Sequence, residues 1–366
     1  MSTDFVITEN GRKTPFEDIY ECIREIGRRP FQPNGSTSYV STCTEKGTGY
    51  IFAVKIIQKK PVHPPKKNAA RDVKFMLKLQ HENIARLKEV FETDLTLYLV
   101  MEHINGEELF KRISVFVTKT ESFPSAFVNP SRLASLPFYT EQIVAHYFRQ
   151  IANGIRFLHE YGIVHKNLKP ENILLSSSRP EAVVKITDAG LDRFMLEDTD
   201  MELVCCNTIY CPPELLLSRR SDKTFDMWSL GLILYITLSG SDPFYPKVDE
   251  DLFRAVLLGD ISYSNEAWNQ VSLNGKDAVK RLLVVDPKQR ALTADILQHS
   301  WICGDHATTE HLLISQSRLG DFNTRRALMN AKFAERKQNI PSTPQYPVQC
   351  NRKFLPVKKT GLDAVR

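Results

Sequence analysis

The chain has 366 residues, of which 42% are hydrophobic and 25% are charged, an ordinary balance for a globular protein with a core of normal size. Its formal net charge of +5 is mild and falls short of the dense basic stripe that nucleic-acid binding usually shows. The seven cysteines are an odd number without regular spacing, which argues against a disulfide framework, and no CxxC pair among them suggests a zinc site. They indicate the reduced thiols of a cytoplasmic or nuclear protein.

No segment of the chain is expected to enter a membrane. The first residues, MSTDFVITENGRK, lack the apolar core of a signal peptide. The longest apolar run, 230–238, contains Gly231 and is too short to span a bilayer. We interpret this run as a buried helix.

The first hundred residues have mostly strand-like patterns. Residues 1–15 are polar and predicted to be flexible. The segments 50–58 and 95–102 are rich in β-branched and aromatic residues, which predicts two strands. Between them, the apolar residues of 69–80 recur at helical spacing, which predicts a helix.

From Glu108 onward the periodicity is mostly helical. Residues 114–138 interrupt it with three prolines and predict an inserted loop. A long amphipathic helix is expected at 140–162, and the proline-containing end, 341–366, is expected to be a flexible tail. Further helices are predicted at 224–239, 249–258, 274–284 and 293–299.

Four short motifs carry the functional signal: FAVK (52–55), HKNLKPEN (165–172), DAG (188–190) and FDMWSLG (225–231). On these motifs the chain resembles the protein kinase superfamily over residues 16–302. The resemblance implies an α+β fold of two lobes, with a β-rich small lobe at 16–102 and an α-rich large lobe at 106–302. It also implies phosphoryl transfer, which needs a cationic cradle for phosphates, oxygen ligands for magnesium and a carboxylate that orients the attacking hydroxyl.

The resemblance assigns the chemistry to four residues. Asn167 stands where the family has its catalytic aspartate, and an amide cannot accept a proton at physiological pH. Lys169 is expected beside the transferring phosphate. Asn172 and Asp188 are the implied magnesium ligands.

The resemblance also implies a site for ATP. Lys55 would bind the nucleotide phosphates and pair with Asp72, which replaces the family's glutamate. Glu108 would contact the ribose. The other candidate nucleotide contacts are Gly35, Val40, Ala53, Glu102, His103 and Leu174.

Several positions depart from the family pattern. Ala189 replaces the phenylalanine of the magnesium motif, which leaves a gap beside the expected stack of Met76, Leu87 and His165. Asn207 replaces a threonine. The phosphate loop, IGRRPFQPNGSTSYV (26–40), has lost glycines and gained two prolines, which cannot donate a backbone amide.

Other positions keep the pattern: Asp226 is expected to hold the catalytic loop, and Glu214 to pair with Arg290. Two interpretations stay open. The chain is either a pseudokinase that regulates or scaffolds other proteins, such as kinases or signalling partners, or a weakly active serine/threonine kinase.

The amino-acid sequences of GEELFKRI (106–113) and of 281–302 resemble those of the calcium/calmodulin-dependent kinase group. Within the segment 303–340, residues 318–337 predict a basic amphipathic helix similar to the regulatory helix of that group. Calmodulin is the implied partner of 312–340; the alternative is a helix that docks on the large lobe. Candidate anchors are Phe322, Leu328, Met329 and Phe333.

Overall fold

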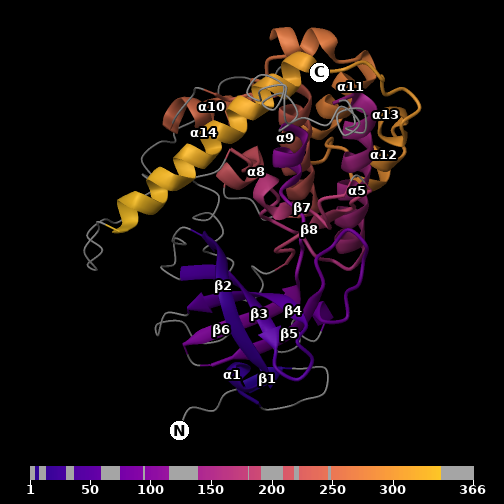
Figure 1. Cartoon of the computed structure of the whole chain (residues 1–366). Helices are drawn as coiled ribbons and strands as arrows, with labels where there is room; N and C mark the ends of the chain where they lie inside the picture. The colour runs from indigo at the N-terminus through magenta and orange to yellow at the C-terminus, as the bar shows by residue number, and fades with distance from the viewer. Residues whose placement is uncertain are drawn as a thin grey trace, which may run out of the picture. The chain divides into compact units, whose positions relative to one another are not determined.

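The computed structural model describes residues 5–7, 14–29, 37–58, 75–93, 95–114, 139–179, 181–190, 209–217, 222–245 and 249–338. The chain divides into two compact units, Met1–Ala327 and Leu328–Arg366. The first unit contains a six-stranded antiparallel sheet, a small two-stranded sheet and a lobe of helices (Figure 1). This arrangement is the two-lobed α+β fold that the motifs predict.

The six-stranded sheet forms the small lobe, in the order β1-β5-β6-β4-β3-β2. The inner strand β4 is buried on both faces, because Ala53 and Ile57 join the main core while Val54 and Ile56 join a second apolar cluster on the other side. The strands are β1 Phe5–Ile7, β2 Tyr20–Arg29, β3 Thr37–Glu45, β4 Ile51–Gln58, β5 Leu87–Glu92 and β6 Thr96–Glu102.

The edge strand β1 differs from the prediction that residues 1–15 are flexible. Phe5, Val6 and Ile7 pair with Glu92, Phe91 and Val90 of β5. Three apolar residues among polar neighbours are too few for a recognisable strand pattern. Their pairing with β5, distant in sequence, is what makes them a strand.

The second apolar cluster is covered by the short helix α1, Phe16–Ile19. The ring of Phe16 stacks on Tyr98 at 4.5 Å and on Tyr20 at 5.4 Å, and meets the edge of Phe91 at 5.5 Å. Aromatic contacts of this kind add stability beyond the apolar area they bury. This face of the sheet is therefore a packed core in its own right.

Two long helices organise the large lobe. α5, Glu141–Glu160, begins at Thr140, whose hydroxyl accepts a hydrogen bond from the amide of Ile143. α9, Lys223–Ser239, is apolar on nearly all sides and buried along almost its whole length, as expected for the run at 230–238. Around them lie α8 Pro213–Leu216, α10 Asp249–Leu258, η3 Glu266–Gln270, α11 Leu273–Leu282, α12 Thr293–Leu297 and α13 Ser300–Cys303.

Between the sheet and the helices lies a short segment that carries the key motifs. It consists of η1 Pro170–Asn172, β7 Ile173–Leu175 and β8 Val184–Ile186, with β7 and β8 antiparallel. The connection from β6 passes through Gly106, where an added Cβ would lie 1.9 Å from the carbonyl oxygen of Leu175. Only glycine fits this close approach of two backbones.

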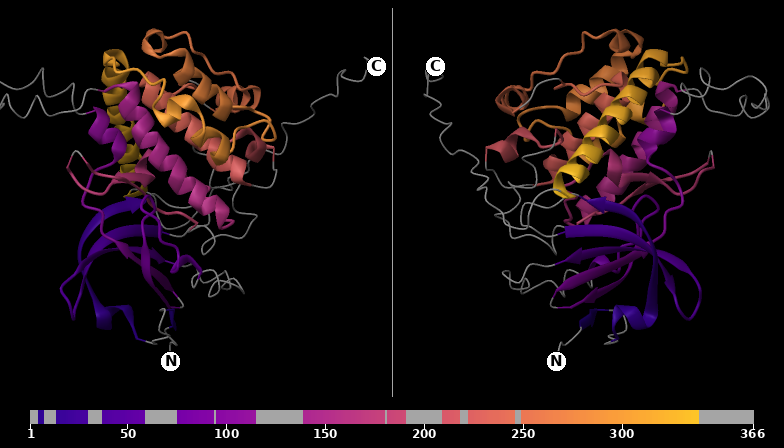
Figure 2. Two further views of the ribbon diagram at one scale, coloured as in Figure 1. Left: turned by 90° about the vertical axis from the view of Figure 1, so that its right-hand side faces the viewer. Right: turned by 60° about the vertical axis from the view of Figure 1, so that its left-hand side comes forward.

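The last helix, α14, spans Leu313–Gln338 and contains the predicted helix 318–337. Figure 2 shows this helix in yellow. Within the first unit Leu319 and Phe322 are buried, Ser315 donates a hydrogen bond to the carbonyl of Leu238 at 2.6 Å, and Asn323 donates to the carbonyl of Phe110 at 2.8 Å. Residues 313–327 therefore dock on the large lobe.

Among the described residues, no helix is both long and apolar enough to cross a bilayer.

The packing of α1 predicts a measurable loss of stability. We expect Phe16→Ala to lower the free energy of unfolding by about 3–5 kcal/mol, because the ring is buried against three other rings. Ile23→Ala on β2, where the side chain is 59% exposed, should change it by less than about 0.5 kcal/mol. Denaturant unfolding of both variants checks this. Equal losses would mean that α1 contributes nothing specific.

Candidate active site

One buried carboxylate, that of Asp226, fixes the backbone at the start of the loop 165–172. Asp226 of α9 accepts hydrogen bonds at 2.8 Å from the backbone amides of both His165 and Lys166. Its Oδ2 also lies 2.8 Å from Nε2 of His159 on α5. Lys166 has a φ of 65°, a left-handed conformation that non-glycine residues rarely adopt. The predicted role of Asp226 is confirmed, and its two hydrogen bonds help to stabilise this conformation.

Asn167 lies in the held loop and is partly buried. Its backbone amide donates to Nδ1 of His165 at 3.2 Å, and its carbonyl accepts from Nδ2 of Asn172 at 2.7 Å. The backbone at this position is therefore fixed. A substrate hydroxyl would meet a side-chain amide, which can accept a hydrogen bond but cannot remove a proton.

Lys55 of the motif FAVK in the small lobe forms an ion pair with Asp188 of the motif DAG in the large lobe. Nζ of Lys55 on β4 lies 3.0 Å from Oδ1 of Asp188, and both side chains are largely buried. Asp188 lies in the turn after β8 and has a φ of 64°, which is the left-handed conformation. Its carboxylate contacts Lys55 from this backbone conformation. The structure thus brings together the predicted phosphate ligand and one predicted metal ligand.

The second predicted metal ligand, Asn172, is fully buried in η1. Its amide nitrogen donates to the carbonyl of Asn167, which orients the side-chain oxygen away from that contact. One amide oxygen and one carboxylate, completed by water and phosphate oxygens, suit Mg²⁺. The residues present therefore fit a magnesium ion that would neutralise phosphate charge, although the described residues contain no cluster of three or more His, Cys, Asp or Glu side chains for a metal.

The other candidate nucleotide contacts lie around the segment that connects the small lobe to the large lobe. Ala53 of β4 pairs directly with Met101 of β6, and Val40 of β3 pairs with Lys55. Leu174 of β7 is linked by an isolated bridge to Glu108. His103 follows the end of β6. Val40, Ala53 and Leu174 are therefore drawn from three different strands.

The carboxylate of Glu102 is bound by two other groups of the protein. Its Oε1 accepts from Nζ of Lys185 at 2.9 Å and from the backbone amide of Arg86 at 2.9 Å. Only its backbone remains as a candidate hinge contact. The sequence shows no pattern that would predict this pairing, because Lys185 and Arg86 are distant along the chain.

Glu108, the predicted ribose contact, forms an ion pair with a residue of α14. Arg326 of α14 forms an ion pair with the carboxylate of Glu108, and its Nη1 lies 3.4 Å from Oε1 of Glu171 in the catalytic loop. Lys111 adds a weaker contact to Glu108 at 3.6 Å. No local pattern in the sequence predicts these contacts of Arg326 with two acidic motif residues, so they are a finding of the tertiary structure.

A second arginine of α14 lies near a buried acid. The guanidinium of Arg325 stands 5.1 Å from the ring centre of Tyr245. Burial raises the pKa of Asp242 to about 6, while the amide of Phe244 and the charge of Arg325 oppose the rise. Because the folded-state pKa is raised, the protonated form of Asp242 favours folding at low pH, and this contribution is lost as the pH rises through about 6.

Met76 lies against Gly190, the chain neighbour of Ala189. A Cβ placed on Gly190 would lie 3.3 Å from Cε and 3.5 Å from Sδ of Met76. Met76, Leu87 and Ala189 belong to one buried cluster, and His165 is buried as well. A flexible thioether fills irregular space well, so Met76 lies where it can compensate for the missing ring.

The scaffold below the site contains the predicted buried ion pair. Nη1 and Nη2 of Arg290 lie 2.7 and 2.8 Å from the two carboxylate oxygens of Glu214. This two-pronged geometry satisfies both groups, as a buried pair requires. The guanidinium also stands 5.2 Å from the ring centre of Trp228.

Several predicted features lie outside the described residues. They are Asp72 and most of the helix 69–80, Gly35 and the proline-containing part of the phosphate loop, Asn207, the loop from 115 to 138 and the tail 341–366. The side-chain environment of Phe333 is also outside them. Their assigned roles stay predictions.

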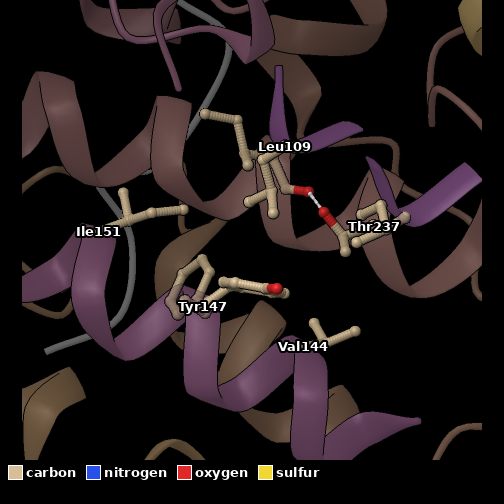
Figure 3. A pocket seen from close by; sticks show the side chains of 8 residues that line it. Leu109, Val144, Tyr147, Ile151 and Thr237 are labelled. Carbon is tan, nitrogen blue, oxygen red and sulfur yellow. Dashed lines mark hydrogen bonds between the residues drawn. The ribbon is translucent and has the colours of Figure 1, made fainter. Parts of the chain in front are cut away.

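A small cavity lies among the helices of the large lobe, away from these motifs (Figure 3). It measures about 10 Å³ and is lined by mostly apolar side chains of Leu109, Val144, Tyr147, Ile151 and their neighbours. Its polar member, Thr237, already donates to the carbonyl of Ile233 at 2.6 Å. This space accepts about one water-sized group and is no substrate site.

Comparison with known proteins agrees with this geometry. A profile of the protein kinase domain matches residues 20–302, so the chain belongs to the protein kinase family. Calcium/calmodulin-dependent protein kinase type IV of Rattus norvegicus is 37% identical over 324 residues, 88% of this chain and 62% of that protein. The protein of the same name from Mus musculus is 36% identical over 349 residues, 94% of this chain and 68% of the relative.

A plant relative, calcium-dependent protein kinase 33 of Arabidopsis thaliana, is 36% identical over 294 residues, 79% of this chain and 51% of its own length. The chain therefore carries a serine/threonine kinase domain of the calcium/calmodulin-dependent type. It spans about two thirds or less of the length of these relatives.

The Arg326 contacts predict how firmly α14 is docked. We expect Arg326→Ala to speed amide hydrogen exchange of residues 319–327 several-fold, because it leaves the partly buried acids Glu108 and Glu171 without this partner. Arg318→Ala is the matched control, since its contact to Glu266 is 4.0 Å and more exposed. Equal exchange in both variants would show that Arg326 does not anchor the helix.

Proposed function

We propose that this chain is a regulatory kinase-like domain in which phosphoryl transfer is strongly impaired. The observation that carries the proposal is Asn167, which replaces the proton acceptor in a loop whose backbone is otherwise held by Asp226 and Asn172. Loss of general-base assistance typically costs about 10²–10⁴-fold in rate. Such a domain acts on other proteins through binding and conformation.

A weakly active serine/threonine kinase is the second candidate function. It is favoured by the buried pair of Lys55 and Asp188 and by the buried Asn172, which together keep the groups that bind phosphate and magnesium. In this candidate Asn167 orients the substrate hydroxyl by a hydrogen bond, and the proton leaves without a protein base.

An assay of phosphate transfer separates the two candidates. We expect purified protein with magnesium-ATP and a mixed peptide substrate to transfer phosphate at no more than about one hundredth of the rate of Asn167→Asp, since the reverted carboxylate can accept the proton. Asp188→Asn serves as the blank that lacks the metal carboxylate. A parent rate well above the blank and equal to that of Asn167→Asp would overturn the impaired function.

Nucleotide binding is part of the same proposal. We expect ATP to raise the thermal midpoint of the parent by a few degrees through its preference for the folded state, and Lys55→Met to abolish the shift. Titration with and without Mg²⁺ tests whether Asn172 and Asp188 recruit the metal. The absence of any shift in the parent would remove ATP from the proposal.

We also propose calmodulin as a partner of 312–340, in a cytoplasmic or nuclear setting. The relatives carry calmodulin in their names. Leu328 and Met329 are 57% and 54% exposed, and a groove for an amphipathic helix accepts such side chains. Phe322, by contrast, is buried on the large lobe, so part of the helix would have to leave that lobe to offer all its anchors.

A pulldown tests this partner. We expect calmodulin resin to retain the full chain in calcium and release it in chelator, and Leu328→Ala with Met329→Ala to weaken retention at least about tenfold, through the loss of two apolar anchors. Leu273→Ala, an 83% exposed leucine on α11, is the control and should bind as the parent does. Equal recovery in calcium and chelator would reject calmodulin.

A further inference from the structure

Two cysteines face each other across the first hairpin of the small lobe. Cys22 of β2 is the direct register partner of Cys43 of β3. Side chains of directly opposed residues in an antiparallel pair lie on the same face, with Cα atoms about 4.5–5.5 Å apart. A disulfide needs Cα atoms about 4.4–6.8 Å apart, so the register alone satisfies this condition.

The surroundings give the two thiols different roles. Cys22 is exposed, whereas Cys43 is fully buried in the cluster beneath α1, next to Tyr20 and Phe91. A dissolved oxidant can therefore reach Cys22 but not Cys43. The buried thiol needs no solvent access to react with a partner that lies directly across the ladder.

Both cysteines are free thiols in the structure, and both are poorly ionised. Burial raises the pKa of Cys43 to about 12, with the negative charge of a Cys22 thiolate as a second, smaller cause. Partial burial also raises the pKa of Cys22. Because the thiolate is the reacting species, exchange at this pair is slow at neutral pH and accelerates as the pH rises.

We propose that Cys22 and Cys43 form a reversible disulfide, with glutathione disulfide as the oxidant. The thiolate of Cys22 attacks one sulfur of glutathione disulfide, forming a mixed disulfide and releasing one glutathione thiolate. The thiolate of Cys43 then attacks the Cys22 sulfur, which forms the cross-strand bond and releases the second glutathione. Two protein thiols are oxidised and one glutathione disulfide is reduced to two thiols, so the exchange balances.

The local backbone can accommodate the bond. The register of β2 against β3 shifts between Cys22 and Arg24, and a bulge of this kind bends the strand beside the pair. The bond would join β2 to β3, the two strands on either side of the predicted phosphate loop. It would close a chain loop from residue 22 to 43, which restricts the unfolded chain and stabilises the hairpin.

Peptide mapping of the full chain tests the proposal. Reduced native protein is incubated with glutathione disulfide at pH 8, alkylated, and digested with trypsin without reduction. We expect one linked species joining the peptide that ends at Arg24 to the peptide that ends at Lys46. The thermal midpoint should rise by about 3–8 °C and return to its original value after dithiothreitol.

Three variants sharpen the result. Cys22→Ser should abolish the link and leave Cys43 unmodified, because Cys43 is buried. Cys43→Ser should stop at a glutathione adduct on Cys22. Cys303→Ser, at a partly exposed cysteine elsewhere, should keep the link and the thermal shift. Should Cys43→Ser fail to fold, Cys22→Ser still decides between the outcomes.

Two outcomes would overturn the proposal. One is a parent protein that accumulates only the Cys22 glutathione adduct, without the linked peptides. The other is a link that forms only after denaturation. Neither outcome depends on ATP binding or phosphate transfer, so the result is independent of the proposed function.

Discussion

The buried carboxylate of Asp226 is the contact on which the candidate site depends. It accepts hydrogen bonds from the backbone amides of His165 and Lys166 and also contacts the ring of His159. Three groups from the loop 165–172 and from α5 therefore converge on one side chain of α9. Each amide left buried without an acceptor would cost about 1–3 kcal/mol. The left-handed Lys166 and the orientation of Asn172 both follow from the loop that this carboxylate holds.

The proposed impairment of phosphate transfer rests on one side chain of this loop. Scaffold contacts are present among the described residues, including the two-pronged pair of Glu214 and Arg290. Asn167 nevertheless carries an amide where the resemblance to protein kinases places the proton acceptor. Under the proposed function, the loop keeps its shape for binding and regulation while its rate of phosphate transfer is low.

The docked part of α14 contacts the same candidate site. Arg326 contacts Glu108, the predicted ribose contact, and Glu171 of the catalytic loop. An ion pair that is partly withdrawn from water is less screened than one at the surface. Release of the helix would expose both acids together, so the position of α14 and access to this part of the site are physically coupled.

The sequence by itself determined the fold family and the two lobes, because its short motifs match those of protein kinases. Through the same resemblance it predicted roles for Lys55, Asn167, Asn172 and Asp188. It also predicted most long helices, whose periodicity is visible in the chain itself. It could not decide that Phe5–Ile7 joins the sheet, or that Met76 lies against Gly190, next to Ala189.

Tertiary structure alone decided which distant groups meet. It placed Arg326 on Glu108, Glu102 on Lys185 and Cys22 opposite Cys43. None of these pairs leaves a periodic signal in the sequence. Each is set by strand register or helix docking, where burial of apolar area fixes the backbones first and the polar partners follow from that placement.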